Sequence, residues 1–155
     1  MSDVQNTVPF LPGRGNDVVF EGEEAHAGPT PMSAREDALV GAANLILEIE
    51  NIALRHSPDG RTTVGTMNSF PNSRNVIPGR VTLGIDMRHP EAEVLALMAE
   101  ELRACFKTVC ETRRTTGSIN EIWYSPPTLF DAGTVDTVEK MAQMRQFSSR
   151  RITSG

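Results

Sequence analysis

Residues 81–88 alternate without interruption between apolar and polar side chains. Val81, Leu83, Ile85 and Met87 are apolar, and Thr82, Gly84, Asp86 and Arg88 lie between them. Because successive side chains of a strand point to opposite faces, this pattern predicts a β-strand with one face in a core and one polar face. The chain must therefore supply further elements that cover a single face of a sheet.

Two amphipathic helices are predicted on either side of this strand. Ser33 and Glu36 match the S-x-x-E capping box, which predicts a helix start at this point. Turn-forming residues 57–60 end that helix. Its apolar residues recur three and four positions apart: Leu39, Ala42, Ala43, Ile46, Ile49, Ile52 and Ala53. The second helix begins at residues 89–91, with Pro90 in its first turn, and ends near Arg113. Its apolar stripe is Val94, Leu95, Met98, Leu102, Cys105 and Val109.

Three further strands complete the series. We expect them at residues 18–20, 63–70 and 119–124. In the second of these, alternation predicts one face made of Val64, Thr66, Asn68 and Phe70. The order β-α-β-β-α-β indicates an α+β, ferredoxin-like sandwich, in which a four-stranded antiparallel sheet carries two helices on one face.

The two ends of the chain fall outside this series. Residues 1–17 hold four prolines and glycines and show no periodicity, so we predict a loose N-terminal lead-in. The main domain then covers residues 18–126. Residues 127–155 contain a predicted helix at 134–146 whose apolar stripe has no partner in the sandwich. We interpret this segment as the start of a further, incomplete domain.

Composition narrows the range of functions. The formal net charge of −5 argues against a nucleic-acid partner, and no apolar run approaches the length of a membrane span. The first residues lack the features of a secretory signal. Cys105 and Cys110 lie in one predicted helix and point about 140° apart, so they are expected to be free thiols in a reducing, cytoplasmic compartment. With only three histidines and no metal-binding motif, a metal site built from this chain is not expected.

Three polar residues are candidates for a site. His26 lies between two alanines in a loop that two glycines and two prolines hold in a non-helical path. Asn75 opens another loop, and Arg88 lies on the polar face of the alternating strand. Each also has a structural interpretation: a solvated histidine, a turn asparagine, and an exposed ion pair between Arg88 and Asp86.

Two segments resemble a known family when they are taken together. Residues 24–32, with Arg35 after them, and the pair Asn-Val-Ile-Pro-Gly at 75–79 and Asp-Met-Arg-His-Pro at 86–90 resemble the lid-domain signature of N-carbamoyl-L-amino-acid hydrolases, allantoate amidohydrolases and β-ureidopropionases. The resemblance implies a lid and dimerisation domain inserted in a metal-dependent catalytic domain that cleaves linear C–N bonds. It implies that His26 stabilises the oxyanion and that Asn75 and Arg88 bind the substrate carboxylate, at the metal site of the neighbouring subunit.

The same resemblance implies a homodimer, a small carboxylate-bearing substrate and a divalent metal of the zinc, manganese or nickel type. The family's metal ligands lie in segments before and after this region, so we expect no metal to be bound by this chain and no activity from the chain alone.

Two alternatives remain open. A non-catalytic ferredoxin-like module could dimerise or bind a small carboxylate ligand. Metal aminoacylases and peptidases of the wider clan share the lid fold, although the segments at 75–79 and 86–90 favour the ureido-acid branch. In every case an exposed edge strand favours pairing of two copies.

Overall fold

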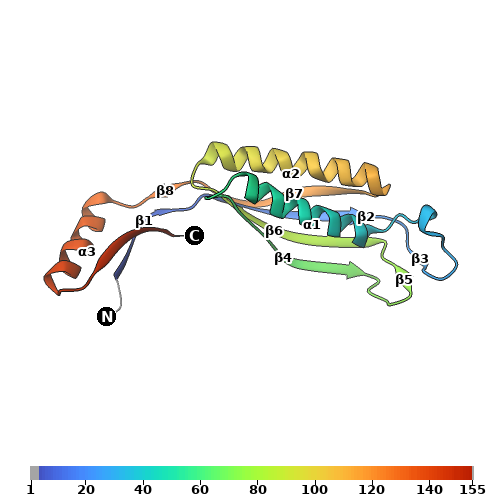
Figure 1. Ribbon diagram of the computed structural model, residues 1–155, viewed down its shortest axis with the longest axis horizontal. Coiled ribbons are helices and arrows are strands. Elements are labelled where there is room, and N and C mark those ends of the chain that lie inside the picture. The colour runs from blue at the N-terminus through green and yellow to red at the C-terminus, as the bar shows by residue number, and fades with distance from the viewer. Residues whose placement is uncertain (1–3, 155) are drawn as a thin grey trace.

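The computed structural model describes residues 4–154, which form a large and a small sheet joined by two short connections (Figure 1). The large sheet consists of β2 (Gly13–Glu21), β4 (Arg61–Phe70), β6 (Arg80–Arg88) and β7 (Thr116–Ser125). The small sheet consists of β1 (Val4–Phe10), β8 (Thr128–Leu129) and β9 (Ser149–Ser154).

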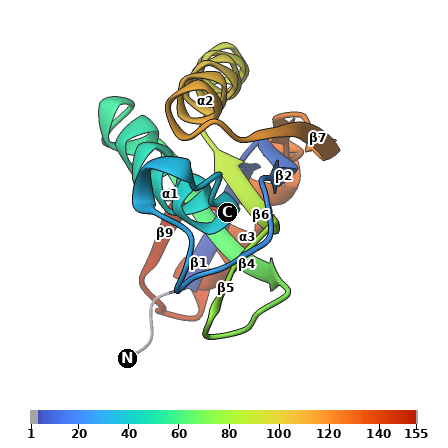
Figure 2. The ribbon, with the colours of Figure 1, turned by 90° about the vertical axis from the view of Figure 1, so that its right-hand side faces the viewer.

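The large sheet confirms the predicted fold class. Its strand order is β4-β6-β2-β7, and every neighbouring pair is antiparallel. Helices α1 (Ala38–Arg55) and α2 (Ala92–Arg113) lie on one face of it, as Figure 2 shows from the end of the sheet. No helix of residues 4–154 covers the other face, so polar side chains on that face are available to solvent or to a ligand.

The core lies between this sheet and the two helices. The alternation in β6 is confirmed, because all four of its apolar residues are buried. They pack with Phe20 of β2 and with the apolar stripes of both helices. The helix residues in this hydrophobic cluster are Ala38, Ala42, Leu45, Ile49, Ile52, Leu95, Met98, Leu102 and Val109. Cys105 and Cys110 are free thiols in α2.

The predicted start of the first helix is wrong. Asp37, and not Ser33, is the N-cap of α1, and its carboxylate accepts hydrogen bonds from the N–H groups of Leu39 (2.9 Å) and Val40 (3.1 Å). Residues Met32–Ala34 form the short 3-10 helix η1 instead. Aspartate and serine are about equally good N-cap residues, so the local sequence is compatible with a helix start at either position. The N-cap hydrogen bonds form at Asp37, the later of the two.

The predicted face of the strand at 63–70 is also wrong. Val64 pairs with Ile85, but the register then shifts, and Thr66 pairs with Gly84 and Asn68 with Thr82. This β-bulge at Gly65 adds one residue, so Val64 faces the helices while Thr66 and the alternate residues after it face the open side. The second helix begins at Ala92 rather than at residues 89–91, so Pro90 precedes it.

The predicted loose lead-in is wrong for most of its length. Residues 4–10 form β1, and β2 begins at Gly13; residues 1–3 lie outside the described part. β1 pairs in parallel with β9 and antiparallel with β8. Its partners come from the far end of the sequence, so no local periodicity could reveal them. Helix α3 (Ala132–Met144) buries Val135 and Ala142 beside this small sheet.

An ion-pair cluster ties the end of α1 to α2. Glu101 accepts hydrogen bonds from Arg55 (2.7 and 3.1 Å) and lies 2.8 Å from Nε2 of His56. Partial burial raises the pKa of Glu101, but the hydrogen bonds from Arg55 and His56 outweigh it, so the pKa lies below its ordinary value of 4.5. The carboxylate therefore stabilises the folded state above that value, and this contribution is lost as the pH falls through the lowered pKa.

We therefore expect Glu101→Gln to destabilise the protein by about 1 kcal/mol at pH 7 and by almost nothing at pH 3. Urea unfolding of both proteins at the two pH values measures this difference. Glu100→Gln is the matched control, because Glu100 pairs only with Arg103 of its own helix. An equal loss at both pH values would contradict the assignment.

Candidate functional site

His26 and Asn75 lie side by side at one end of the large sheet. His26 ends β3 (Ala25–His26), which pairs antiparallel with β5 (Val76–Ile77). The N–H of Ala27 donates to the carbonyl of Asn75 at 2.9 Å. Figure 1 shows this strand pair beyond the ends of β4 and β6, and we call it the distal end.

The imidazole of His26 is exposed and accepts one hydrogen bond from its own loop. Its Nδ1 accepts a hydrogen bond from the N–H of Gly28 at 3.0 Å. A nitrogen that accepts carries no proton, so in the neutral ring the proton is on Nε2. His26 therefore presents an N–H donor away from its own loop.

Asn75 presents a similar arrangement. Its Oδ1 accepts a hydrogen bond from the hydroxyl of Ser73 at 3.0 Å. The side-chain NH2 group remains as a donor at an exposed position. Two donors, an imidazole N–H and an amide NH2, thus come from adjacent loops at the distal end.

The loops are attached firmly to the sheet. The N–H of Gly22 donates to the carbonyl of Gly79 (2.8 Å), and the N–H of Glu23 donates to that of Glu36 (2.9 Å). A Cβ on Gly22 would stand 1.9 Å from the carbonyl oxygen of Glu36, so only glycine permits this close approach.

Arg88 lies at the opposite end of the sheet. β6 starts next to the distal end, where Arg80 pairs with Glu21, and Arg88 follows eight residues later. At about 3.3 Å per residue this separates the two ends by roughly 26 Å. One chain therefore brings His26 and Asn75 together and leaves Arg88 apart from both. We call the Arg88 end, where the connections to the small sheet begin, the proximal end.

The guanidinium of Arg88 is held by Asp86. Nε donates to Oδ1 at 2.8 Å and Nη2 donates to Oδ2 at 3.0 Å. This hydrogen bonding raises the pKa of Arg88, so the group stays charged. The bidentate pair occupies one edge of the guanidinium and leaves the edge formed by Nη1 and Nη2 for another acceptor.

Trp123 is a neighbour of this pair that sequence reasoning missed. Gly15 of β2 pairs with Asp86 on one side and with Trp123 on the other. A Cβ on Gly15 would stand 1.9 Å from the indole Nε1, and one on Gly13 2.7 Å from the far edge of the ring. The indole thus lies flat over two glycines. The Gly-x-Gly spacing could have indicated a close approach, but not which side chain makes it.

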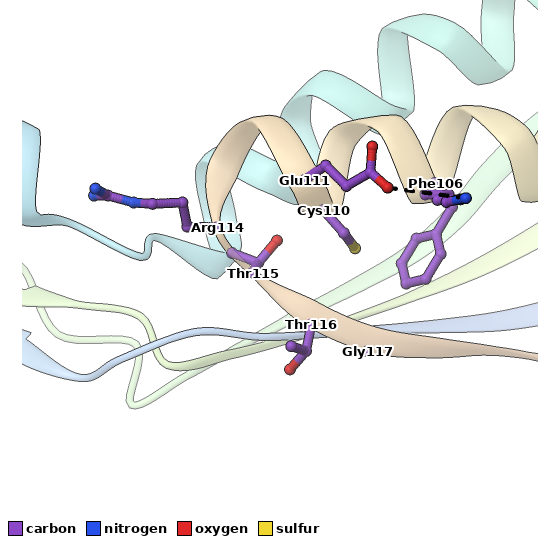
Figure 3. A pocket seen from close by; sticks show the side chains of 8 residues that line it. Phe106, Cys110, Glu111, Arg114, Thr115, Thr116 and Gly117 are labelled. Atoms are coloured by element: carbon purple, nitrogen blue, oxygen red, sulfur yellow. Dashed lines mark ion pairs between the residues drawn. The ribbon is translucent and has the colours of Figure 1, made fainter.

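The hollows of the large sheet and its helices lie elsewhere. One of about 490 Å³ lies where α2 turns into β7, and Figure 3 shows Phe106, Cys110 and Thr115 in it. Lys107 and Glu111, which form an ion pair of 3.9 Å, also line it. Burial raises the pKa of Cys110, so this thiol is not activated. A second hollow, of about 400 Å³, lies on the open face and is lined in part by Asp17, Thr66 and Asn120. Neither includes a predicted site residue.

No metal site is formed by the residues that the structure describes. Among residues 4–154, no three His, Cys, Asp or Glu side chains are grouped so that they could hold a metal ion. The residues present therefore do not fit the divalent metal that the resemblance implies. In the same range, no helix is both long and apolar enough to cross a membrane.

Comparison with known proteins places this arrangement in a family. The model of the peptidase dimerisation domain matches residues 14–114, which include both helices and, apart from Gly13, the strands β2, β4 and β6 of the large sheet. The chain belongs to the peptidase dimerisation domain family. The match confirms the resemblance to this family that the sequence indicated.

Similar proteins carry amidohydrolase names. The chain is 34% identical over 134 residues to an N-carbamoyl-L-amino-acid amidohydrolase of Rhizobium meliloti, covering 86% of this chain and 32% of the relative. It is 31% identical over 138 residues to an allantoate amidohydrolase of Bacillus subtilis, covering 89% of this chain and 34% of the relative. The chain thus spans about a third of the length of these relatives.

A solved structure gives the same result. The crystal structure of a hydantoinase/carbamoylase family amidase from Burkholderia vietnamiensis matches with a TM-score of 0.94 and 40% identity, covering 97% of this chain and 37% of that one. Because almost the whole chain is covered, the small sheet and α3 belong to the shared architecture as well.

Proposed function

We propose that this chain is the lid and dimerisation part of a metal-dependent amidohydrolase that cleaves the linear ureido C–N bond of N-carbamoyl-L-amino acids or of allantoate. The observation that carries the proposal is the pair of outward donors, His26 and Asn75, on firmly attached loops within a family domain whose relatives are named for these substrates. The metal and its ligands belong to the rest of such an enzyme.

His26 acts on the reacting carbonyl. When water adds to the ureido carbon, the carbonyl oxygen gains negative charge, and the Nε2–H of His26 donates to it. A donor that is already aligned costs no reorganisation when the charge forms, and its removal costs roughly 3–4 kcal/mol of transition-state stabilisation. The Gly28 N–H supports this role because it occupies Nδ1 and leaves the proton on Nε2.

Arg88 and Asn75 bind the substrate carboxylate. The free Nη1–Nη2 edge of Arg88 matches the two oxygens of a carboxylate, and Asp86 holds the guanidinium in one orientation. The amide of Asn75 adds one donor. A neutral Asp86–Arg88 pair binds an anion less strongly than a lone arginine, but it loses less side-chain entropy on binding.

Two copies of the chain are needed to unite these groups. β4 is an edge strand, and it runs from Arg61, which pairs with Arg88, to Phe70 near the distal end. Antiparallel pairing of β4 with β4 of a second copy sets the proximal end of one sheet beside the distal end of the other. Exposed apolar side chains of β4 and α1 support the interface: Met67 of β4 and Leu47 and Leu54 of α1 are each more than half exposed.

A chimaera tests the proposal. Residues 14–125 of this chain replace the matching segment of the Rhizobium meliloti relative, which supplies the rest of the enzyme. We expect metal-dependent release of ammonia from an N-carbamoyl-L-amino acid by the chimaera and none by the 155-residue chain. We expect Arg88→Ala to raise KM by about 10- to 100-fold with a smaller change in kcat.

Arg80→Ala is the matched control. Arg80 belongs to the same strand but pairs with Glu21 at the other end, so its loss should leave KM unchanged. A folded, dimeric chimaera that hydrolyses neither N-carbamoyl amino acids nor allantoate would contradict the proposal. Binding of these compounds by the isolated chain with an affinity that depends on Arg88 would favour a non-catalytic carboxylate-binding module.

A further inference from the structure

We propose that Arg35 and Arg114 are positioning residues for His26. They form a connected set of hydrogen bonds from the end of α2 to the loop that carries the imidazole. The inference deepens the proposed function, since it rests on His26 as the donor of that site. It concerns two side chains whose guanidinium groups donate hydrogen bonds to backbone carbonyls.

Arg35 holds the loop directly. Its Nη2 donates to the carbonyls of Ala27 (2.8 Å) and Thr30 (3.1 Å), and its Nε donates to that of Thr30 (3.2 Å). These two carbonyls bracket Gly28, whose N–H occupies Nδ1 of His26. The hydroxyl of Thr30 also donates to the carbonyl of His26 at 2.8 Å. The guanidinium of Arg35 therefore holds the backbone on both sides of Gly28. The N–H of Gly28 in turn keeps the proton of the neutral imidazole on Nε2.

Arg114 holds the segment from which Arg35 projects. Its Nη2 donates to the carbonyls of Ser33 (2.7 Å) and Arg35 (3.0 Å). Arg114 lies 79 residues later in the sequence than Arg35, immediately after α2. The segment between β2 and α1 is thus attached to the C-terminal end of α2 and not only to the large sheet.

The backbone of Arg114 supplies an independent observation. It is the C-cap of α2 with φ 56° and ψ 30°, a left-handed conformation that favours glycine. A side chain with a Cβ is strained there. A glycine would relieve that strain and still end the helix, but it would give up both hydrogen bonds to the loop.

The substitution Arg114→Gly therefore separates an effect on the order of the His26 loop from an effect on the stability of the fold. Arg114→Gly should leave the thermal midpoint unchanged or higher, because backbone strain is relieved and an exposed side chain is lost. The same substitution should loosen the His26 loop. A residue with a merely structural role would lower the stability and the loop order together.

Nuclear magnetic resonance of the 15N-labelled 155-residue chain at pH 8 measures the loop order. The reporters are the scalar coupling across the hydrogen bond from Gly28 N to His26 Nδ1 and the exchange rate of the Gly28 amide. We expect Arg114→Gly and Arg35→Ala to abolish the coupling and to speed that exchange about tenfold. Arg35→Lys should retain part of both, since an ammonium reaches one carbonyl but not two.

Arg113→Ala is the matched control. Arg113 is the preceding residue, and its guanidinium donates to Asn44 of α1 rather than to the loop, so both reporters should stay within twofold of the wild type. Wild-type coupling and exchange in Arg114→Gly and Arg35→Ala would overturn the proposal. So would an equal loss in Arg113→Ala. The measurement needs no substrate and no metal, so a failure of the proposed hydrolase function would leave its result unaffected.

Discussion

Two variants that are each impaired alone, His26→Ala and Arg88→Ala, are expected to recover activity when they are mixed within one dimer. Each should lower kcat/KM of the chimaera by about 10- to 1000-fold by itself. In a mixed dimer, one of the two sites combines the intact Arg88 of one subunit with the intact His26 of the other. Random pairing makes half of all dimers mixed, so the mixture should show about a quarter of the wild-type activity.

The physical reason is the length of the sheet. About 26 Å of β6 separates the two groups in one chain, and a rigid strand cannot close that gap. A two-fold axis beside β4 makes the second sheet run in the opposite direction. The proximal end of one sheet then lies beside the distal end of the other. The site is then built from the distal end of one subunit and the proximal end of the other.

A second mixture is the matched control. His26 and Asn75 both come from the distal end, so every mixed dimer of His26→Ala with Asn75→Ala has a defect in each site. That mixture should stay as impaired as its two components. Recovery in both mixtures, or in neither, would contradict a site shared between two subunits. Subunit exchange is followed by native mass spectrometry of differently tagged chains.

The fold was predictable where its signals are local. The alternation of β6 and the stripes of α1 and α2 each report one buried face, and together they indicated the order of elements. The errors arose where a distant partner decides the structure. The bulge at Gly65 is fixed by the register against β6, and β1 exists because β9 and β8 pair with it. Neither the bulge nor β1 produces a periodic pattern of apolar residues in its own segment.

The candidate site shows the same division. The loop chemistry around His26 could be recognised from its own residues, and so could the Asp86–Arg88 pair on one polar face. The distance between them could not, because it depends on the direction of β6. Arg114 carried no sequence signal either: it follows a helix, where a basic residue is ordinary, and only its left-handed backbone distinguishes it.

The largest loss of stability is expected from Gly117→Ala at the start of β7. Gly117 has φ 152° and pairs with Phe20, and a Cβ at this position would stand 1.8 Å from the carbonyl oxygen of Val19. That oxygen belongs to the backbone of a central strand, so it cannot move aside as a flexible side chain would. The ring of Phe106, 3.2 Å from the same point, blocks the other direction.

We therefore expect a loss of roughly 3–5 kcal/mol, from the strained backbone and from separation of β2 and β7 together. In a chain of this size it lowers the thermal midpoint by about 10–15 °C, measured by circular dichroism. Gly65→Ala is the matched control in the same sheet: no atom lies within 4 Å of its added Cβ, so the change should stay within about 0.5 kcal/mol. A Gly117→Ala protein as stable as Gly65→Ala would show that β7 can leave β2 at this point without cost, and that the α2–β7 corner does not hold the sheet in register.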